Sequence, residues 1–351
     1  MSELGTLLTD TVTRLFHDLV TKELIESAEK GVWPDKLWRA LEEGGLTLPL
    51  VAEARGGAGG TWRDAHTVVR AAGKHAVPLP LAETIVGGWL LDQAGLDVPL
   101  GPLTIAPVHQ DDTLRLEGAA GGWRLSGTAS RVPWGAAASH LVVVAAGGDS
   151  PLVALVARAA AGRATADRNL ALEPRDTLSF DGAEVVAAAP ARVAPDAAIL
   201  YGAMIRAAQM AGALESLLEQ SVRYATERKQ FGKPIGNFQA IQHNLAVLAG
   251  HVAAAGSAAE QAFVAADRGD PRRAVAAAKI RAGEAAGIGA GIAHQVHGAI
   301  GFTYEHSLHF ATRRLWSWRA EFGTESVWAQ VLGRAVAARG ADRLWPDLTV
   351  R

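Results

Sequence analysis

Two segments of the chain are far more specific than the composition and combine charged, amide, aromatic and small residues. One runs from Arg223 to His243 (RYATERKQFGKPIGNFQAIQH) and the other from Gln295 to His306 (QVHGAIGFTYEH). In the first, Arg228 can pair with phosphate oxygens in a fork and Phe231 can pack on a ring, while small residues let the backbone approach a ligand closely. The alternative is structural, with Arg228 in a surface ion pair and Phe231 in the core, because both situations are common.

The composition excludes several other kinds of site. The 34 Lys and Arg residues balance 36 Asp and Glu residues to a formal charge of -2, so we expect neither nucleic acid nor an anionic membrane as a partner. The chain has no cysteine, which excludes disulfides, thiolate metal sites and a cysteine nucleophile, and no metal site is predicted. The N-terminal residues do not resemble a signal peptide, and the most apolar long stretch, Ala285 to Phe302, is too polar to span a bilayer. We therefore expect a cytoplasmic protein.

The elements that must position the two segments follow the order helices, strands, helices. Residues 1–98 carry apolar positions at helical spacing, and residues 99–197 carry short alternating or β-branched runs between Gly, Asp and Pro turns. Long helices are predicted again at 198–230, 237–267, 271–296 and 324–338. Pro271 suits a first helical position and Thr324 can cap the last helix. The pattern predicts an α+β fold with an N-terminal helical domain (1–98), a middle antiparallel β-domain (99–197) and a C-terminal four-helix bundle domain (198–351).

Together with the RRLW and EFGTES runs that follow them, the two segments resemble the acyl-CoA dehydrogenase family, and the order of elements extends the resemblance over nearly the whole chain. The resemblance implies FAD as the cofactor and an acyl-CoA thioester as the substrate. A carboxylate would remove the α-proton while the β-hydrogen leaves as hydride to flavin N5. The α-proton is acidic only if the enolate is stabilised, so this chemistry needs donors at the carbonyl, a carboxylate at the α-carbon and a flavin beside the bond.

In that family each FAD lies between two subunits: one holds the flavin ring and the base, and its neighbour grips the ADP portion. This chain matches the neighbour's part in both segments. The residues that the resemblance assigns to the partner's FAD are Arg228, Gln230, Phe231, Gln239, Gln295, Gly298 and Ala299, with Gly301 beside them.

The part that would hold the chain's own flavin ring departs from the family's pattern. Family members show a TEP-x-x-GSD-like segment where this chain reads TIAPVHQDD, from Thr104 to Asp112. Leu125 to Gly127 match the turn before the family's W-I-T strand, which puts Arg131 to Pro133 at the W-I-T positions. Proline offers neither the hydroxyl nor the backbone N–H of threonine, so flavin-ring contacts are not expected from this subunit.

The usual catalytic base is also absent from its position. The glutamate of the family's Y-E-G-T run falls at Phe322, and the position that a minority of members use, on the helix before ERKQFG, falls at Gly202. Glu321 is the candidate catalytic residue if the loop slips by one residue, a step that turns a side chain by roughly 100° on a helical turn. The alternative for Glu321 is a solvated carboxylate. Weaker candidates, whose commoner role is that of polar groups at a helix start or an interface, are Glu305, His306 and His297.

This chain keeps the residues that contact a partner's FAD, but it lacks those that hold its own flavin ring and the catalytic base. This combination indicates a non-catalytic subunit. We expect an α2β2 heterotetramer in which a homologous partner supplies the base, as in the heteromeric acyl-CoA dehydrogenases of bacterial steroid degradation, whose shorter subunits this chain resembles. Electron-transfer flavoprotein or a similar acceptor would take up the electrons. Two alternatives stay open: an acyl-CoA lyase or dehydratase on the same scaffold, and a structural subunit without FAD.

Overall fold

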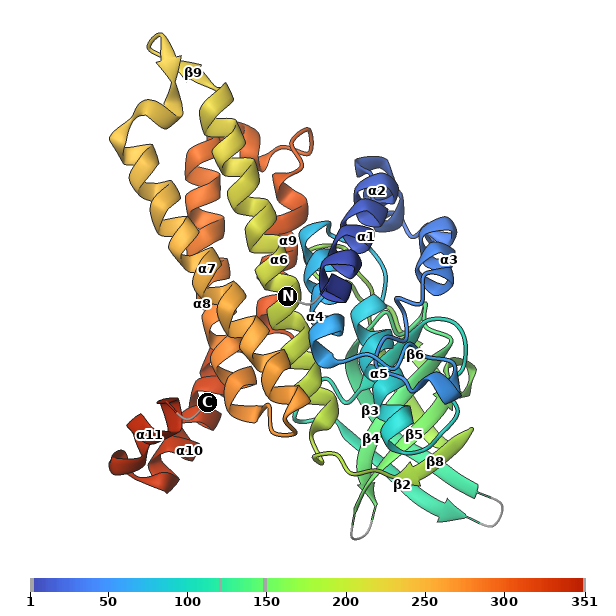
Figure 1. Ribbon diagram of the computed structural model, residues 1–351. Coiled ribbons are helices and arrows are strands. Elements are labelled where there is room, and N and C mark those ends of the chain that lie inside the picture. Colours follow the sequence, from blue (N-terminus) through green and yellow to red (C-terminus); the bar gives the residue numbers. More distant parts are fainter. Residues whose placement is uncertain (1–2, 120–121, 148–149, 350–351) are drawn as a thin grey trace.

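The computed structural model describes residues 3–119, 122–147 and 150–349. The predicted order of helices, strands and helices is confirmed: a helical N-terminal part and a β-sheet part lie along one side of a long helical bundle (Figure 1). Buried apolar side chains of all three parts form one continuous hydrophobic core. The predicted ranges 1–98, 99–197 and 198–351 therefore describe changes in secondary structure along a chain that packs around a shared core.

The described residues of the N-terminal part form five α-helices and a short 3-10 helix (Glu53–Arg55). The α-helices are α1 (Glu3–Leu19), α2 (Lys22–Glu29), α3 (Asp35–Glu43), α4 (Trp62–Lys74) and α5 (Leu81–Gln93). Helix α4 begins where Thr61 and Asp64 form a reciprocal capping box, which satisfies two backbone donors at the helix start. Helix α5 is apolar nearly all round and packs on the sheet, where a Cβ on Gly87 would touch Leu103 and Val142 at 3.3 and 3.2 Å.

The middle part contains two four-stranded sheets, with strand orders β1-β4-β5-β8 and β2-β3-β7-β6. The strands are β1 (Leu103–Ala106), β2 (Thr113–Ala119), β3 (Gly122–Pro133), β4 (His140–Gly147), β5 (Ser150–Ala157), β6 (Arg163–Thr165), β7 (Arg175–Glu184) and β8 (Ala187–Pro190). The antiparallel arrangement predicted for this part holds for every pair but one, because β1 and β4 run parallel. Between these two strands the chain leaves for the second sheet, which supplies the crossover that a parallel pair requires.

The C-terminal part is a bundle of four helices followed by two that extend away from it (Figure 1). The bundle helices are α6 (Ala197–Glu227), α7 (Gln239–Asp267), α8 (Arg272–His297) and α9 (Leu308–Ala320), and α10 (Glu325–Arg339) and α11 (Leu344–Thr349) follow. Three of the four predicted long helices lie in the bundle within three residues of their predicted ends. The fourth, predicted at 324–338, is α10, and only Trp328 of its side chains is fully buried. The sequence pattern did not predict α9.

Helix α6 is long and apolar enough to cross a membrane by composition, and among the described residues it alone passes that test. However, 94% of the apolar window is buried inside the protein. Helix α6 is therefore the central core helix of the bundle, and both α4 and α9 pack against it.

Candidate functional site

The turn between α9 and α10 carries both the candidate base and the usual base position. Glu321 ends α9 in an extended conformation, and Phe322 and Gly323 follow with φ angles of 54° and 95°. A left-handed phenylalanine is uncommon because its Cβ crowds the backbone, so its surroundings must hold it in place. Trp328 contributes by donating its indole N–H to the Phe322 carbonyl at 2.9 Å. The turn is thus fixed by its contacts and is not free to slip by one residue.

The two positions at which the family places its base, Phe322 and Gly202, lie against each other. The Phe322 side chain is 1% exposed, and a Cβ built on Gly202 would come within 2.3 Å of its ring. Glycine is therefore needed on this face of α6 because the ring occupies the space. A carboxylate at position 202 would have to displace that ring, whereas one at position 322 would replace it.

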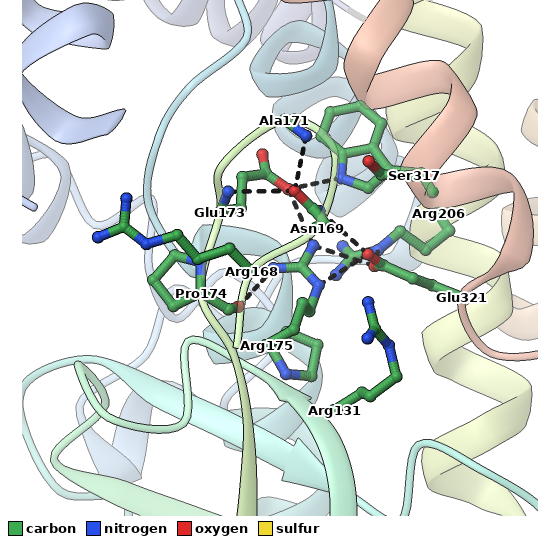
Figure 2. Close-up of polar contacts among 12 residues, drawn as sticks. Arg131, Arg168, Asn169, Ala171, Glu173, Pro174, Arg175, Arg206, Ser317 and Glu321 are labelled. Atoms are coloured by element: carbon green, nitrogen blue, oxygen red, sulfur yellow. Dashed lines mark hydrogen bonds and ion pairs between the residues drawn. The ribbon is translucent and has the colours of Figure 1, made fainter. Parts of the chain in front are cut away.

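The carboxylate of Glu321 lies between the guanidinium groups of Arg175 and Arg206 (Figure 2). Its Oε1 accepts from Arg175 Nε at 2.7 Å, and its Oε2 accepts from Arg206 Nε at 2.6 Å. The side chain is 10% exposed, so the expectation of a solvated carboxylate is wrong. Although burial opposes the charged form, the two guanidinium groups lower the pKa of Glu321 to about 2. A carboxylate held this way is a poor proton acceptor at neutral pH.

The contacts of Glu321 belong to a larger buried network of three glutamates and three arginines. Figure 2 shows four of its members, Glu173, Arg175, Arg206 and Glu321. Arg206 also pairs with Glu83 of α5, and Arg175 also pairs with Glu173 at 2.8 Å. Arg314 of α9 lies 3.1 Å from the second oxygen of Glu173. The six charges cancel, and every side chain is at most 10% exposed. The network joins α5, α6, β7 and α9, so it connects the three parts of the chain beside the usual base position.

A cavity of about 350 Å³ lies at this turn, between the β-sheets and the bundle, and Glu321 is among its lining residues. Its lining includes Ser130 and Arg131 from β3, and Ser317, Phe322 and Thr324 from the bundle side. The volume is at the lower end of the range of small-molecule pockets, which is about 300–1,000 Å³.

Residues 131–133, at the W-I-T positions, form an irregular end of β3. The pairing of β3 with β7 shifts register between Ala129 and Val132, and Arg131 adopts a φ of 52° in this bulge. The Arg131 guanidinium pairs with Asp167 at 2.7 Å. The Pro133 carbonyl accepts from the buried Thr104 hydroxyl at 2.5 Å. This edge is thus occupied by contacts within the chain.

Lys279 is a feature that the sequence reading missed. It lies on α8 with no exposed surface, and its Nζ donates to the carbonyls of Arg319 and Gly323 at 2.7 Å each. Burial lowers its pKa to about 7. A lysine within the apolar run AVAAAKIRA was the available signal. The two bonds fix both ends of the turn that carries Glu321 and Phe322.

The residues predicted to contact a partner's FAD all lie exposed at one end of the bundle. The hairpin β9 (Lys229–Gln230) and β10 (Lys233–Pro234) projects at that end (Figure 1). A small cluster around Ala225, Ile235 and Val296 packs the end of α6 and the start of α7 against the end of α8. The fold therefore brings the Arg228–Gln239 segment close to the Gln295–Ala299 segment, although about 60 residues separate them in the sequence.

The structural alternatives for Arg228 and Phe231 are both wrong. The Arg228 guanidinium forms no ion pair with the described residues, and the Phe231 side chain is 90% exposed in a left-handed conformation with φ of 50°. Among the described residues, the side-chain amides of Gln230, Gln239 and Gln295 are also without a hydrogen-bond partner. This surface thus presents an exposed apolar ring beside several side-chain donors that are free to contact a ligand or water.

The weaker candidates take structural places. His297 is 3% exposed, stacks on Tyr224 at 4.6 Å between ring centroids and bonds the Ala293 carbonyl through Nδ1. His306 lies edge-on to His297 at 4.7 Å. The Glu305 carbonyl accepts from Lys22 at 3.0 Å, which ties this segment to the N-terminal part.

Comparisons with known proteins identify the family of the chain. The family described as acyl-CoA dehydrogenase, C-terminal domain, matches residues 192–337. The acyl-CoA dehydrogenase IpdE2 of Mycobacterium tuberculosis is 31% identical over 289 residues, which are 80% of this chain and 80% of that protein. IpdE2 of Mycolicibacterium smegmatis is 30% identical over 90% of this chain and 93% of that protein.

Solved structures give the same result. The ChsE4-ChsE5 complex from Mycobacterium tuberculosis contains a chain that superposes with a TM-score of 0.88 at 26% identity, covering 97% of this chain and 99% of that one. A chain of the Tcur3481-Tcur3483 steroid acyl-CoA dehydrogenase variant superposes with a TM-score of 0.85 at 28% identity, covering 96% and 98%. From its sequence relatives and its fold, this chain belongs to the acyl-CoA dehydrogenase family.

Proposed function

We propose that this chain is a subunit of a flavin-dependent acyl-CoA dehydrogenase that completes the FAD site of a homologous partner and carries no catalytic base of its own. The observation that carries the proposal is the packing of the Phe322 ring on Gly202, which fills both places from which a base could act. Glu321 is assigned a structural role, because both of its oxygens are bound to buried arginines.

The chain's own pocket does not fit a flavin ring. Its β3 edge presents the bulged Arg131, paired with Asp167, and a proline at the position of the family's threonine. On the bundle side, the space beside the usual base position is filled by Arg206 and its buried ion pairs with Glu83 and Glu321. An acyl chain there would have to displace buried charges from their partners, which is strongly unfavourable.

The end of the bundle that carries the Arg228–Gln239 and Gln295–Ala299 segments, its outer end, is suited to bind the ADP portion of an FAD whose flavin ring lies in another subunit. The unpaired Arg228 guanidinium can grip pyrophosphate oxygens in a fork, and Gln239 and Gln295 offer further donors. The exposed Phe231 ring offers an apolar face. Gly298, with φ of 63° and no atom within 4 Å of where a Cβ would lie, lets a ligand approach the backbone closely. When bound, the flavin accepts the hydride from the β-carbon of the acyl thioester.

The relatives support the choice of partner. IpdE2 is named an acyl-CoA dehydrogenase, and the two solved structures are a complex of ChsE4 with ChsE5 and a steroid enzyme of two named chains. We therefore propose a cytoplasmic α2β2 heterotetramer with a homologous chain that contains the base. Its substrate would be a ring-bearing acyl-CoA, and electron-transfer flavoprotein or a similar protein would accept the electrons.

The proposal is tested by purifying the chain alone and together with a homologous acyl-CoA dehydrogenase chain that has the glutamate. We expect flavin, and its bleaching by acyl-CoA, only in the complex. A colourless homo-oligomer that hydrates an enoyl-CoA would instead establish the lyase or dehydratase, and a stable complex without flavin would establish a structural subunit.

Arg228→Ala is expected to weaken FAD retention by the complex roughly tenfold or more, because a hydrogen bond between charged groups contributes about 1.5–3 kcal/mol. The readout is flavin per complex after gel filtration at several FAD concentrations. Arg163→Ala, at an exposed position of β6, is the matched control and should leave the flavin content unchanged. Equal flavin content in the two variants would refute the cross-subunit assignment.

Phe322→Glu is expected to create no dehydrogenase activity in the chain alone. The Arg206 guanidinium lies 5.5 Å from the Phe322 ring centroid, so a carboxylate there would pair with it and be a weak base. Acyl-CoA oxidation with an artificial electron acceptor is the assay, and the wild-type chain is the baseline. Turnover by this variant without a partner would show that the flavin site is complete within the chain.

A further inference from the structure

One face of α8 is shaped to hold the turn between α9 and α10. Lys279, Gly283 and Gly287 follow one another at intervals of four residues, so they lie on the same face of the helix. A Cβ on Gly283 would overlap the Glu325 carboxylate, and one on Gly287 would lie 3.2 Å from the Arg319 guanidinium. The two glycines therefore make room for the ion pair of Arg319 with Glu325, which bridges the end of α9 and the start of α10.

Lys279 holds the same turn from the buried side. Its Nζ donates at 2.7 Å each to the Arg319 carbonyl, in the last turn of α9, and to the Gly323 carbonyl, just before α10. Glu321 and Phe322 lie between these two carbonyls and line the cavity of about 350 Å³. We refer to Lys279 and the Arg319–Glu325 ion pair together as the clasp. The clasp joins the two helices across the turn that forms one wall of the cavity.

The number of acceptors at Lys279 matches a neutral amine. A neutral amine has two N–H groups, whereas a lysine ammonium has three. No third acceptor for Nζ is present among the described residues. Lys279 also has no exposed surface, so a third N–H could not reach water while the clasp is closed. A buried donor without a partner is unfavourable, and a buried charge adds to that penalty. The closed clasp therefore favours the neutral form.

The charged groups around Lys279 do not reverse this preference. They come from three helices and the turn: Arg206 on α6, Arg319 on α9, Glu325 on α10 and Glu321. The two carboxylates favour the ammonium, and the two guanidinium groups oppose it. Helix α7 contributes none of these groups, and its His251 instead contacts Arg281 at 2.6 Å, about 200° around α8 from Lys279. Burial outweighs the carboxylates and lowers the pKa of Lys279 to about 7.

We propose that the clasp is a proton-sensitive switch, which is tightest when Lys279 is a neutral amine and opens more readily when Lys279 is protonated. Opening gives Nζ access to water, where the ammonium finds its third partner. Because the turn carries Phe322 and leads into α10, opening exposes the wall of the cavity and frees the direction in which α10 leaves the bundle. This property belongs to the chain itself and holds whether or not the chain completes a partner's FAD site.

The direction of the pH effect follows from the lowered pKa. Below about pH 7 both the closed and the open form bind the proton, and above about pH 10.5, the ordinary lysine value, neither does. Between these limits the open form binds more protons than the closed form. The opening equilibrium should therefore rise as the pH falls from about 10.5 to about 7 and level off below that.

Hydrogen exchange of the full chain between pH 6 and 9 tests the switch. After division by the intrinsic exchange rate, the protection of residues 319–328 should rise roughly tenfold or more from pH 7 to 9, but less than about twofold from pH 6 to 7. The ordinary pKa values of carboxyl and imidazole groups lie below this window, and that of tyrosine lies above it. A rise between pH 7 and 9 that disappears with Lys279 therefore identifies the lysine as its source.

Lys279→Met removes the titrating group and keeps much of the volume. Protection of residues 319–328 should be lower at every pH, because two carbonyls lose their donor, and it should change less than about twofold from pH 7 to 9. Lys74→Met is the matched control, since its pair with Glu219 is exposed to solvent, and it should keep the wild-type rise. The same rise in Lys279→Met would overturn the proposal. So would a wild-type chain without the rise, a result that does not depend on whether the variant folds.

Discussion

Replacing Arg206 with methionine is expected to lower the free energy of unfolding by about 3–5 kcal/mol, because breaking a buried ion pair leaves uncompensated charge in the core. Arg206 is 1% exposed and is shared by two buried carboxylates, those of Glu83 and Glu321. Methionine keeps most of the volume, so the loss reports on charge rather than on a cavity. Urea unfolding at pH 7 and a fixed protein concentration measures the effect.

The matched control is Arg70→Met. Arg70 pairs with Glu215 across α4 and α6, but its side chain is 46% exposed, so the expected loss is below about 1 kcal/mol. Adding Glu83→Gln to the Arg206 variant should restore part of the stability, since it removes one of the two orphaned charges. An Arg206 variant no less stable than the Arg70 variant would show that the network does not hold the three parts together.

The fold was largely predictable because its long elements carry local signals. Helices α6, α7 and α8 have apolar faces and recognisable ends, such as Pro271 just before α8. Helix α9 was missed because buried polar residues such as His309 and Arg314 interrupt its apolar pattern. These polar side chains are buried because they contact residues far away in the sequence, and the spacing of apolar residues along the helix cannot reveal such contacts.

The site was predictable only where a motif marks it. Phe322 and Gly202 were both named from the sequence, yet their contact depends on how α9 packs on α6. The ion-pair network has no sequence signature, since Arg206 reaches Glu83 across 123 positions and Glu321 across 115. The burial of Glu321 therefore had to come from the structure, and it replaces the expectation of a solvated side chain.

The two ends of the bundle have opposite character. At the inner end, every charge of the network has an ion-pair partner within this chain, although Glu83 Oε2 and Arg314 Nε have no hydrogen-bond partner among the described residues. At the outer end, the Arg228 guanidinium has no ion-pair partner among the described residues and the Phe231 ring is 90% exposed. A subunit that acts by completing its neighbour should have this distribution, because its unsatisfied groups must face the neighbour.

Glu321→Gln is expected to lower the free energy of unfolding at pH 7 by on the order of 3 kcal/mol, because the pKa of Glu321 falls to about 2 in the fold. The sign follows from the direction of that shift. A carboxyl group whose pKa is lowered by folding binds fewer protons in the native state than in the unfolded state, so its contribution is complete above the unfolded pKa. The contribution is lost as the pH falls from about 4.5 toward about 2. The difference between the wild type and the variant should therefore be constant near neutral pH and shrink over that acidic window.

The same variant separates a structural role for Glu321 from a catalytic one. If Glu321 serves Arg175 and Arg206, the complex of Glu321→Gln with the partner should keep its turnover number at 25 °C while its unfolding midpoint falls. If Glu321 is the base, turnover should disappear from a complex that is still folded, since an amide cannot take up the α-proton. Glu184→Gln is the control, because its pair with Arg124 is exposed and spans 3.9 Å, and it should change stability by less than about 1 kcal/mol. A fixed turn, two saturated carboxylate oxygens and a lowered pKa all favour the first outcome.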